Sequence, residues 1–267
     1  MPVPNADLEL TVAGRYRRGA RIGGGGSSSV HRATEIASGR EVALKSFHLH
    51  RAFDPELLPA LRRAAEIAMR LGPETMPPLL EVGVDDDGVP FVAMPLLDGE
   101  TLGAVIDRGP LPPRQAAALG ARVLAALDRL HALGHTHGDL SPDNVFATRD
   151  GKVLLLDHES FGPIGAARPS RRTEGYGEAG GVRAVDDDLA ALVAIVRALA
   201  GRSDGAPRVD AHTFARALRR GALDEAIAML GMASSRAPRE RLAVLRIAAL
   251  VAVLILAMVL GWGLLRG

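Results

Sequence analysis

Residues 137–144, HGDLSPDN, hold an aspartate and an asparagine at a short spacing between an Ala-rich helical pattern and a short apolar strand. The carboxylate of Asp139 can accept the proton of an attacking hydroxyl group. Asn144 and Asp157, the latter at the end of the apolar run VLLLD, supply oxygen atoms of the kind that bind magnesium. Aspartate and asparagine also serve as ordinary turn and cap residues, which is the alternative interpretation. Their types and order favour a site for phosphate transfer.

A glycine-rich turn and a lysine precede this segment. Residues 22–30, IGGGGSSSV, lie between two strand-like segments, and glycines there let backbone N–H groups approach phosphate oxygens. A flexible surface hairpin is the alternative for the turn alone. Lys45 ends the apolar run VALK directly after this hairpin, where a lysine can pair with the phosphates of a nucleotide. Turn and lysine together favour nucleotide binding.

In these motifs the chain resembles the Hanks-type protein kinase family, in particular the bacterial membrane-anchored serine/threonine kinases. The resemblance covers residues 16–201 and includes VALK, the segment FVAMPLLDGETL, the long helical segment before HGDLSPDN, and the strand that ends at Asp157. It implies an α+β fold of two lobes, a β-rich N-terminal lobe and a helical C-terminal lobe, with ATP bound in the cleft between them.

The resemblance also implies roles for single residues. Lys45 would bind the phosphates, Asp139 would be the catalytic base, and Asn144 and Asp157 would bind Mg²⁺. Ser141 stands where the family has a lysine two residues after the base, and it is counted with the catalytic residues. The residues implied in nucleotide binding are Ile22, Gly23, Gly25, Val30, Ala43, Lys45, Met94, Leu96 and Glu66.

Several positions depart from the family pattern. The arginine that usually precedes the catalytic aspartate is Gly138, which argues against activation through a phosphorylated loop. The metal-binding motif reads Asp157-His158-Glu159 in place of Asp-Phe-Gly, so that the ligand is kept and the packing Phe and flexible Gly are lost. The expected Ala-Pro-Glu is missing where GEAGG stands, which puts the binding of peptide substrates in question.

The helix glutamate that pairs with the phosphate-binding lysine in this family has two candidate positions. Glu66, in RRAAEIAMR, is the candidate by residue type. A gapless alignment to the following strand places Ala64 there instead. The sequence leaves both positions open.

The periodicity of apolar residues predicts the elements that must position these groups. Asp187 resembles the buried aspartate that begins the helix after the activation segment and braces the catalytic loop. The chain after Gly201 is too short for the family's full set of C-terminal helices, so we expect a shortened C-terminal lobe. Helices are expected over residues 55–71, 112–133, 186–199 and 209–232. Strands are expected over residues 15–22, 30–35, 41–47 and 152–157, and two strands joined by an acidic, glycine-ended turn are expected within residues 81–97.

Composition limits the class of partner and predicts a membrane anchor. The net charge of +1 gives no reason to expect nucleic acid as a partner, and the absence of cysteine excludes disulfides and a cysteine nucleophile. Residues 247–265, IAALVAVLILAMVLGWGLL, are uncharged, and at ~1.5 Å per residue they span roughly the ~30 Å apolar core of a bilayer. A buried core helix is the alternative, but the segment has no polar stripe.

The predicted domain order follows from these segments. It comprises an N-terminal extension (1–13), a kinase-like domain (14–232), a basic juxtamembrane linker (233–246) and one transmembrane helix (247–265). Arginines crowd the linker side of the helix, so the positive-inside rule places the kinase-like domain in the cytoplasm, on a single-pass anchor in the inner or plasma membrane.

Three functions are compatible with the sequence. The first is a membrane-anchored serine/threonine kinase that uses ATP and Mg²⁺ to phosphorylate protein substrates. The second is a pseudokinase that acts as a membrane-tethered interaction module, which the DHE motif and the missing Ala-Pro-Glu would suit. The third is a small-molecule phosphotransferase, which HGD and the missing peptide-binding segment would suit.

Overall fold

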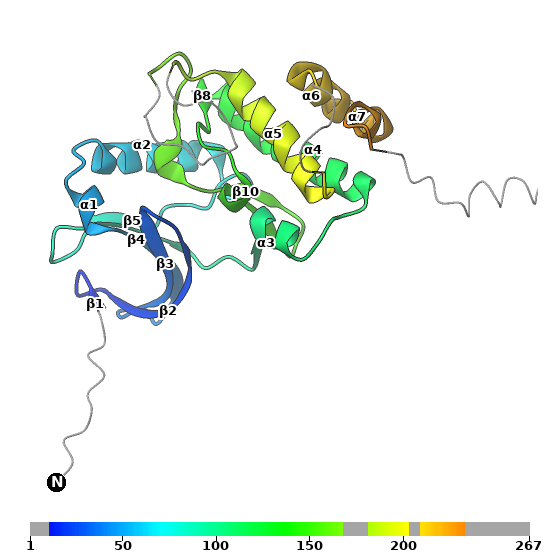
Figure 1. Cartoon of the computed structure of the whole chain (residues 1–267). Coiled ribbons are helices and arrows are strands. Elements are labelled where there is room, and N and C mark those ends of the chain that lie inside the picture. The colour runs from blue at the N-terminus through cyan, green and yellow to red at the C-terminus, as the bar shows by residue number, and fades with distance from the viewer. Residues whose placement is uncertain (1–10, 168–180, 203–208, 233–267) are drawn as a thin grey trace, which may run out of the picture.

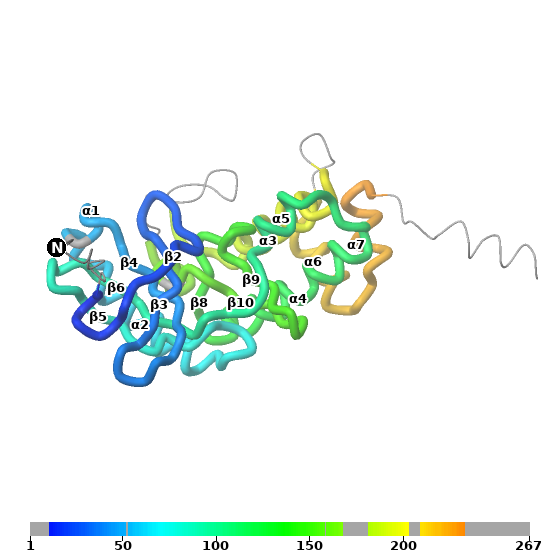
Figure 2. The backbone as a smooth tube through the Cα atoms, turned by 90° about the horizontal axis from the view of Figure 1, so that it is seen from below, coloured from blue at the N-terminus to red at the C-terminus, as the bar shows by residue number. Residues whose placement is uncertain are grey.

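The computed structural model describes residues 11–167, 181–202 and 209–232. These residues form two lobes, a sheet-rich lobe near the N-terminus and a helical lobe after it (Figure 1). The sheet-rich lobe lies at one end of the molecule and helices α6 and α7 lie at the other end (Figure 2). This arrangement agrees with the α+β, two-lobed fold expected from the sequence.

The N-terminal lobe is an antiparallel sheet of six strands in the order β1-β2-β3-β4-β6-β5. The sheet begins at Thr11, inside the predicted N-terminal extension, because β1 pairs with β2 and buries Val12. The strands are β1 (Thr11–Val12), β2 (Tyr16–Gly24), β3 (Ser28–Glu35), β4 (Glu41–Phe47), β5 (Glu81–Val84) and β6 (Pro90–Pro95), and the lobe's helices are α1 (Leu49–Ala52) and α2 (Leu57–Leu71).

Strand β4 shows why this lobe can position a lysine. Side chains alternate between the two faces of a strand. Val42 and Leu44 enter one apolar cluster with Tyr16 and Phe91. Ala43 and its neighbours on the opposite face enter a second cluster that includes the buried Leu57 and Leu61 of α2. Lys45 follows the parity of Ala43, so alternation places its side chain on the face toward α2.

The C-terminal lobe is built around one large apolar cluster. Two small sheets, in the orders β10-β9-β7 and β11-β8, carry the loops of the site. The elements are β7 (Gly99–Thr101), α3 (Leu102–Asp107), α4 (Pro113–Ala132), β8 (His135–Thr136), η1 (Pro142–Asn144), β9 (Val145–Thr148), β10 (Val153–Leu155), η2 (His158–Ser160), β11 (Gly162–Pro163), α5 (Val185–Leu199), α6 (Ala211–Arg219) and α7 (Leu223–Met229).

Two expectations for this lobe have different outcomes. The long helix expected over residues 112–133 is confirmed as α4. The single helix expected over residues 209–232 is wrong, because the segment forms α6 and α7. Gly221 lies between them with φ 69°, a left-handed conformation that ends a helix.

Helices α4 and α5 approach closely at Gly120. A Cβ atom built on this residue would lie 2.4 Å from a methyl carbon of Val196 on α5. The glycine therefore determines how near the two helices can lie.

Replacing Gly120 by alanine is expected to lower the free energy of unfolding by about 1–2 kcal/mol, because overpacking a core outweighs the gain in helix propensity. Urea denaturation of the full chain measures the effect. The double variant Gly120→Ala/Val196→Ala, which removes the contacting methyl groups, should recover most of the loss. A Gly120→Ala protein as stable as the parent would contradict this packing.

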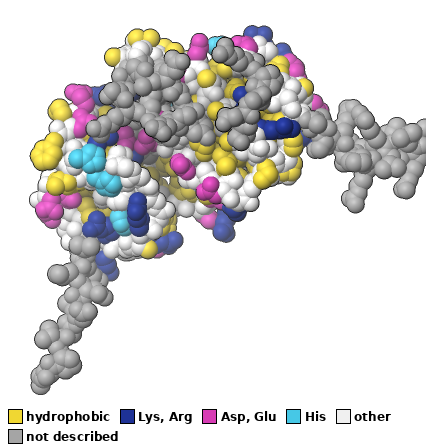
Figure 3. All heavy atoms as spheres, viewed as in Figure 1, with side chains coloured by type: hydrophobic (Ala, Val, Ile, Leu, Met, Phe, Trp, Pro, Cys, Tyr) yellow, Lys and Arg dark blue, Asp and Glu magenta, His cyan; other side chains and the backbone are white. Residues whose placement is uncertain are grey.

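The charge of the surface and the length of the described helices concern two predicted partners, nucleic acid and the membrane. On the face drawn in Figure 3, basic and acidic side chains are interspersed over both lobes. Within the part of the chain that the structure describes, no helix has the length and apolar character needed to cross a membrane. The predicted linker (233–246) and transmembrane helix (247–265) lie outside the described residues.

Candidate active site

Lys45 lies between two carboxylates at the junction of the lobes. Its Nζ atom donates to Oδ1 of Asp157 at 2.7 Å and to both carboxylate oxygens of Glu159, at 2.8 and 2.9 Å. Asp157 follows strand β10 and Glu159 lies in η2, so both partners come from the DHE segment. The side chains of Lys45 and Glu159 are each only 10% exposed, which strengthens these ion pairs relative to surface pairs.

Burial disfavours the charged forms of all three groups. For Lys45, the two carboxylates outweigh burial and raise its pKa. For Asp157, the Lys45 ammonium outweighs burial and lowers its pKa to about 2. For Glu159, burial and the neighbouring Asp157 charge raise its pKa to about 7 in spite of Lys45. Asp157 is therefore the firmly ionised carboxylate of this pair.

The backbone of Asp157 is unusual for a residue with a side chain. Its φ is 60°, in the left-handed region that costs a non-glycine residue roughly 1–2 kcal/mol. The salt bridge to Lys45 offsets this strain and keeps the carboxylate on the lysine. Strain held at a candidate site in this way is consistent with a functional constraint on the residue.

The structure does not pair Glu66 with Lys45, which corrects the expectation for that residue. Glu66 is exposed on α2, whereas Ala64 is buried at 1% exposure on the same helix. The helix therefore turns Ala64 inward, as the gapless alignment indicated, and it has no carboxylate at that position. Glu159 supplies the carboxylate instead.

The catalytic loop is held to the strand that follows it. The side-chain amide of Asn144 donates to the carbonyl oxygen of Asp139 at 2.8 Å. The backbone N–H of Leu156 donates to the carbonyl oxygen of Asn144 at 2.9 Å, which links this loop to the residue just before Asp157. Ser141, at the start of η1, is buried at 2% exposure and lies within this loop. The predicted base and both predicted metal ligands therefore belong to one connected unit.

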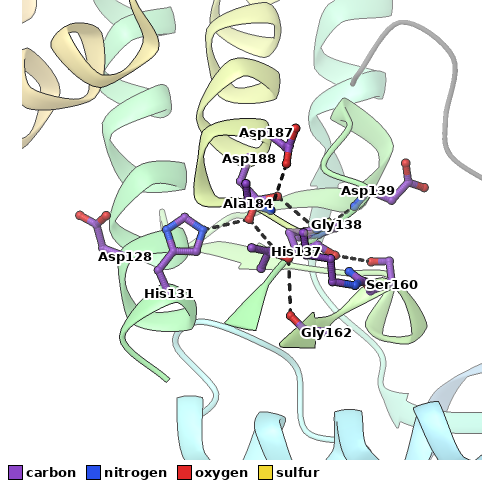
Figure 4. Close-up of polar contacts among 12 residues, drawn as sticks. Asp128, His131, His137, Gly138, Asp139, Ser160, Gly162, Ala184, Asp187 and Asp188 are labelled. Atoms are coloured by element: carbon purple, nitrogen blue, oxygen red, sulfur yellow. Dashed lines mark hydrogen bonds and ion pairs between the residues drawn. The ribbon is translucent and has the colours of Figure 1, made fainter. Parts of the chain in front are cut away.

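Asp188 braces the catalytic loop from helix α5 (Figure 4). Its buried carboxylate accepts hydrogen bonds from the backbone N–H groups of His137 (2.8 Å) and Gly138 (3.1 Å), and it lies 2.9 Å from Nε2 of His131. The carboxylate of Asp139 points away from this brace. Because Asp188 fixes its backbone, the loop presents Asp139 in a defined direction.

The expectation that Asp187 is the bracing residue is wrong by one position. Asp187 accepts a hydrogen bond from the backbone N–H of Ala184 and so caps the start of α5. The buried face of α5 includes Leu192, Val196 and Leu199. Tracing this stripe back by one helical turn reaches Asp188, and that periodicity is the signal that could have identified it.

His137 is fully buried and packs against Phe161. The two ring centroids are 5.0 Å apart, and burial lowers the pKa of the histidine. Phe161 follows Asp157 by four positions and belongs to the large core cluster. It supplies an aromatic contact to the catalytic loop that the DHE motif itself was expected to lack.

Arg183 occupies the space beside Gly138. A Cβ atom on Gly138 would lie 2.1 Å from Nη1 of Arg183, and a Cβ on Gly162 would lie 2.5 Å from its Nε. The guanidinium donates to the carbonyl oxygen of Ser160 at 2.5 Å, and the residue is 7% exposed. Because position 138 is glycine and not the arginine usual in the family, there is room beside it for the side chain of Arg183, which precedes α5.

Replacing Gly138 by arginine, the residue usual in the family, is expected to lower the free energy of unfolding by about 2–4 kcal/mol. The reasons are its φ of 83° and the overlap with Arg183. Thermal unfolding of the full chain measures the loss. Adding Arg183→Ala should recover the part that comes from overlap, and a Gly138→Arg protein that unfolds like the parent would contradict this account.

An apolar cluster joins four of the apolar residues implied in nucleotide binding. Ala43 pairs with Met94 across β4 and β6, and both are buried. Val30 and Leu96 pack against the same cluster. Ile22 stays 49% exposed on β2. The structure thus brings together Val30, Ala43, Met94 and Leu96 and leaves Ile22 outside the cluster.

The glycine-rich turn closes the β2–β3 hairpin. Gly23 pairs with Val30 across the two strands. Gly24 has φ 124°, and a Cβ there would lie 2.5 Å from the carbonyl oxygen of Ser28, so the turn requires glycine at this position. A Cβ atom built on Gly25, a glycine predicted to bind the nucleotide, would have no other atom within 4 Å. The backbone N–H of Gly25, however, donates to the carbonyl oxygen of Ser28 at 2.9 Å and so closes the turn.

The predicted metal ligands suit Mg²⁺. Because the amide nitrogen of Asn144 is engaged by Asp139, its amide oxygen remains as the metal-binding atom. Mg²⁺ is usually held by one or two carboxylates together with phosphate oxygens and water. Among the described residues there is no group of three or more His, Cys, Asp or Glu side chains that could hold a metal alone. The amide oxygen of Asn144 and the carboxylate of Asp157 are oxygen ligands of the kind that Mg²⁺ takes.

Comparison with known proteins agrees with this geometry. A model of the protein kinase domain matches residues 16–172, which is more than half of the chain. Serine/threonine-protein kinase PksC of Streptomyces coelicolor is 33% identical over 154 residues, which are 55% of this chain and 28% of that protein. Serine/threonine-protein kinase PknL of Mycobacterium bovis is 34% identical over 57% of this chain and 38% of its own length.

A third relative, serine/threonine-protein kinase PknE of Mycobacterium bovis, is 34% identical over 167 residues, which are 62% of this chain and 29% of that protein. The chain thus matches less than half of the length of each of these relatives. A two-lobed fold, a lysine–aspartate pair between the lobes and a braced HGD loop are the features of a kinase-like domain. With the match to the kinase domain, the chain belongs to the protein kinase family.

Proposed function

We propose that this chain is a serine/threonine protein kinase that transfers the γ-phosphate of ATP to hydroxyl groups of proteins. The observation that carries the proposal is the 2.7 Å contact between Lys45 and Asp157, beside the loop in which Asn144 holds Asp139. Phosphoryl transfer requires positioning and charge neutralisation, and these residues supply a cation, a metal-binding carboxylate and a base. The names of the relatives, which are serine/threonine kinases, support the same activity.

Each residue would have a defined part in the reaction. Asp139 would orient the substrate hydroxyl and take its proton as the oxygen bonds to the γ-phosphorus and the bond to the β-phosphate oxygen breaks, releasing ADP. Lys45 would neutralise phosphate charge. Mg²⁺, held by Asn144 and Asp157, would neutralise the charge that develops on the phosphates. The apolar cluster at Ala43 and Met94 would hold the adenine.

The experiment that tests the proposal is phosphate transfer by the full chain, purified in detergent. The protein is incubated with Mg²⁺ and γ-labelled ATP, with a degenerate Ser/Thr peptide library as acceptor. Label on the chain or on peptides, lost in Asp157→Asn, would support a protein kinase. ATP consumption with soluble alcohols or amines and no labelled protein would instead identify a small-molecule phosphotransferase.

A pseudokinase is the second candidate, and one observation favours it. Lys45 is already neutralised by Asp157 and Glu159, so the site is electrostatically satisfied without a nucleotide. In that case the folded parent and Asp157→Asn would both leave peptide and chain unlabelled. Captured partners would then define the function as a tethered interaction module.

The membrane anchor is part of the proposal and rests on residues 247–265 with the arginine-rich linker before them. The kinase domain would face the cytoplasm of a single-pass protein in the inner or plasma membrane. The full chain is expected to sediment with membranes and to resist alkaline extraction. Leu254→Arg/Ile255→Arg should release it, because each arginine at a span centre costs about 2.5–3.5 kcal/mol. A parent chain found free in the soluble fraction would exclude the anchor.

A further inference from the structure

We propose that Glu159 is the positioning residue for Lys45, in the role for which the family resemblance implies a glutamate on the helix of the N-terminal lobe. This proposal rests on the proposed kinase function and names a residue that serves the same site. Both carboxylate oxygens of Glu159 lie within 2.9 Å of the Lys45 Nζ atom. Two hydrogen bonds from one carboxylate fix the position of an ammonium group on a flexible stem better than one bond does.

Helix α2 has the features expected if Glu159 takes the place of the glutamate that the family resemblance implies on this helix. Ala64 is buried at 1% exposure, yet it is absent from the three apolar clusters of the described residues. Its helix neighbours Leu61 and Ala68 belong to the clusters of the two different lobes. The short side chain therefore lies at the junction between the lobes, where η2 with Glu159 packs against α2.

Glu159 and Asp157 would divide two tasks between them. Asp157 stands at the predicted metal-binding position and gives Lys45 one oxygen, whereas Glu159 gives it two, so in the reaction the Asp157 carboxylate is the one needed for Mg²⁺. Glu159 would then remain as the partner that holds the Lys45 ammonium toward the phosphates. Without Glu159, Lys45 would lose its partner whenever Asp157 binds the metal.

The location of Glu159 has a consequence for regulation. In a kinase whose lysine is held from the helix, a shift of that helix breaks the pair. Here both carboxylate partners of Lys45 lie within residues 157–159, and helix α2 supplies no carboxylate to it. The alignment of Lys45 therefore depends on the DHE segment and not on a carboxylate carried by α2.

The first test measures the state of Lys45 without using activity. Lys45 and Lys152 are the two lysines of the chain, and Lys152 is 52% exposed and serves as internal reference. The full chain is acylated with an N-hydroxysuccinimide acetate, and each site is quantified by mass spectrometry. Acylation of Lys45 relative to Lys152 should rise about tenfold in Glu159→Gln and Glu159→Gly, since each pKa unit lost raises the neutral amine tenfold.

The second test moves the carboxylate to the helix. Glu159→Gly should lower kcat for phosphate transfer about 10–100-fold, as expected for loss of a positioning contact. Adding Ala64→Glu should restore both the protection of Lys45 and a large part of kcat. Glu74→Gly, which removes an exposed carboxylate just beyond α2, is the control and should change neither quantity.

The outcomes separate this proposal from the kinase function. A rise in Lys45 acylation that Ala64→Glu reverses supports the positioning role, even if the parent transfers no phosphate and the kinase proposal fails. Unchanged Lys45 acylation in the folded Glu159→Gln protein overturns the role, whatever the activity. If Glu159→Gly does not fold, the near-isosteric Glu159→Gln variant and the Ala64→Glu/Glu159→Gly protein decide the question.

Discussion

Replacing Asp139 by asparagine is expected to lower kcat for phosphate transfer by about 10²–10⁴-fold, the usual contribution of a general base. The fold should survive the change. Two of the bonds that hold the loop here run through the backbone, since the Asp139 N–H faces Nδ1 of His137 and its carbonyl oxygen accepts from Asn144. Asparagine keeps both bonds and removes only the proton-accepting charge.

The measurement combines single-turnover kinetics with thermal unfolding of the full chain. Asp143→Asn, an exposed aspartate of the same loop, is the matched control and should keep kcat near that of the parent. An equal loss of kcat in Asp143→Asn would show that the total charge of the loop matters, and that Asp139 does not act as a specific general base. Phosphate transfer at the parental rate in Asp139→Asn would show that Asp139 is not the catalytic base.

Replacing Lys45 by methionine is expected to lower the free energy of unfolding by about 3–5 kcal/mol, the range for breaking a buried ion pair by removing one partner. In addition, it should abolish phosphate transfer. The lysine is 8% exposed and separates two carboxylates, Asp157 and Glu159. Without the ammonium these two groups face one another in a buried site, and one of them must take up a proton.

A double-mutant cycle and a pH series test the origin of that loss. Glu159→Gln in the Lys45→Met background should recover part of the stability, because one of the unpaired carboxylates is removed. In the parent the folded pKa of Glu159 is already above its unfolded value, whereas Lys45 lowers that of Asp157. In Lys45→Met the pKa of Asp157 would also rise above its unfolded value, so the folded variant binds more protons than the folded parent. Its deficit relative to the parent should therefore shrink as the pH falls from about 7 to about 5. A deficit independent of pH and of Glu159 would point to packing alone.

Elements whose signals are local in the sequence were predicted from it. The strands expected on either side of the glycine turn and through VALK are present as β2, β3 and β4. The long helix before the loop was equally clear, since prolines begin it and Gly134 follows it. Its boundaries differ from the expected range by one residue at each end.

Errors of one or two positions arose where a helix face had to be assigned. Asp187 and Asp188 are adjacent in the sequence, but they point in directions about 100° apart around a helix. Ala64 and Glu66 are two positions apart on α2 and point in directions about 200° apart, on nearly opposite faces. Residue type favoured Glu66, whereas burial selects Ala64, because the face of α2 is determined by its packing against the sheet and η2.

The sequence by itself determined the family and the two-lobed fold, and it predicted the lysine, aspartates and asparagine of the site, because these lie in motifs whose spacing is local. Only the tertiary structure decided which carboxylate meets Lys45 and which arginine lies beside the catalytic loop. Glu159 is 114 residues from Lys45, and Arg183 is 45 residues beyond Gly138. Such pairs depend on how the two lobes and helix α5 pack against each other. Only in the packed structure do the small residues Ala64 and Gly138 lie next to the segments that carry Glu159 and Arg183.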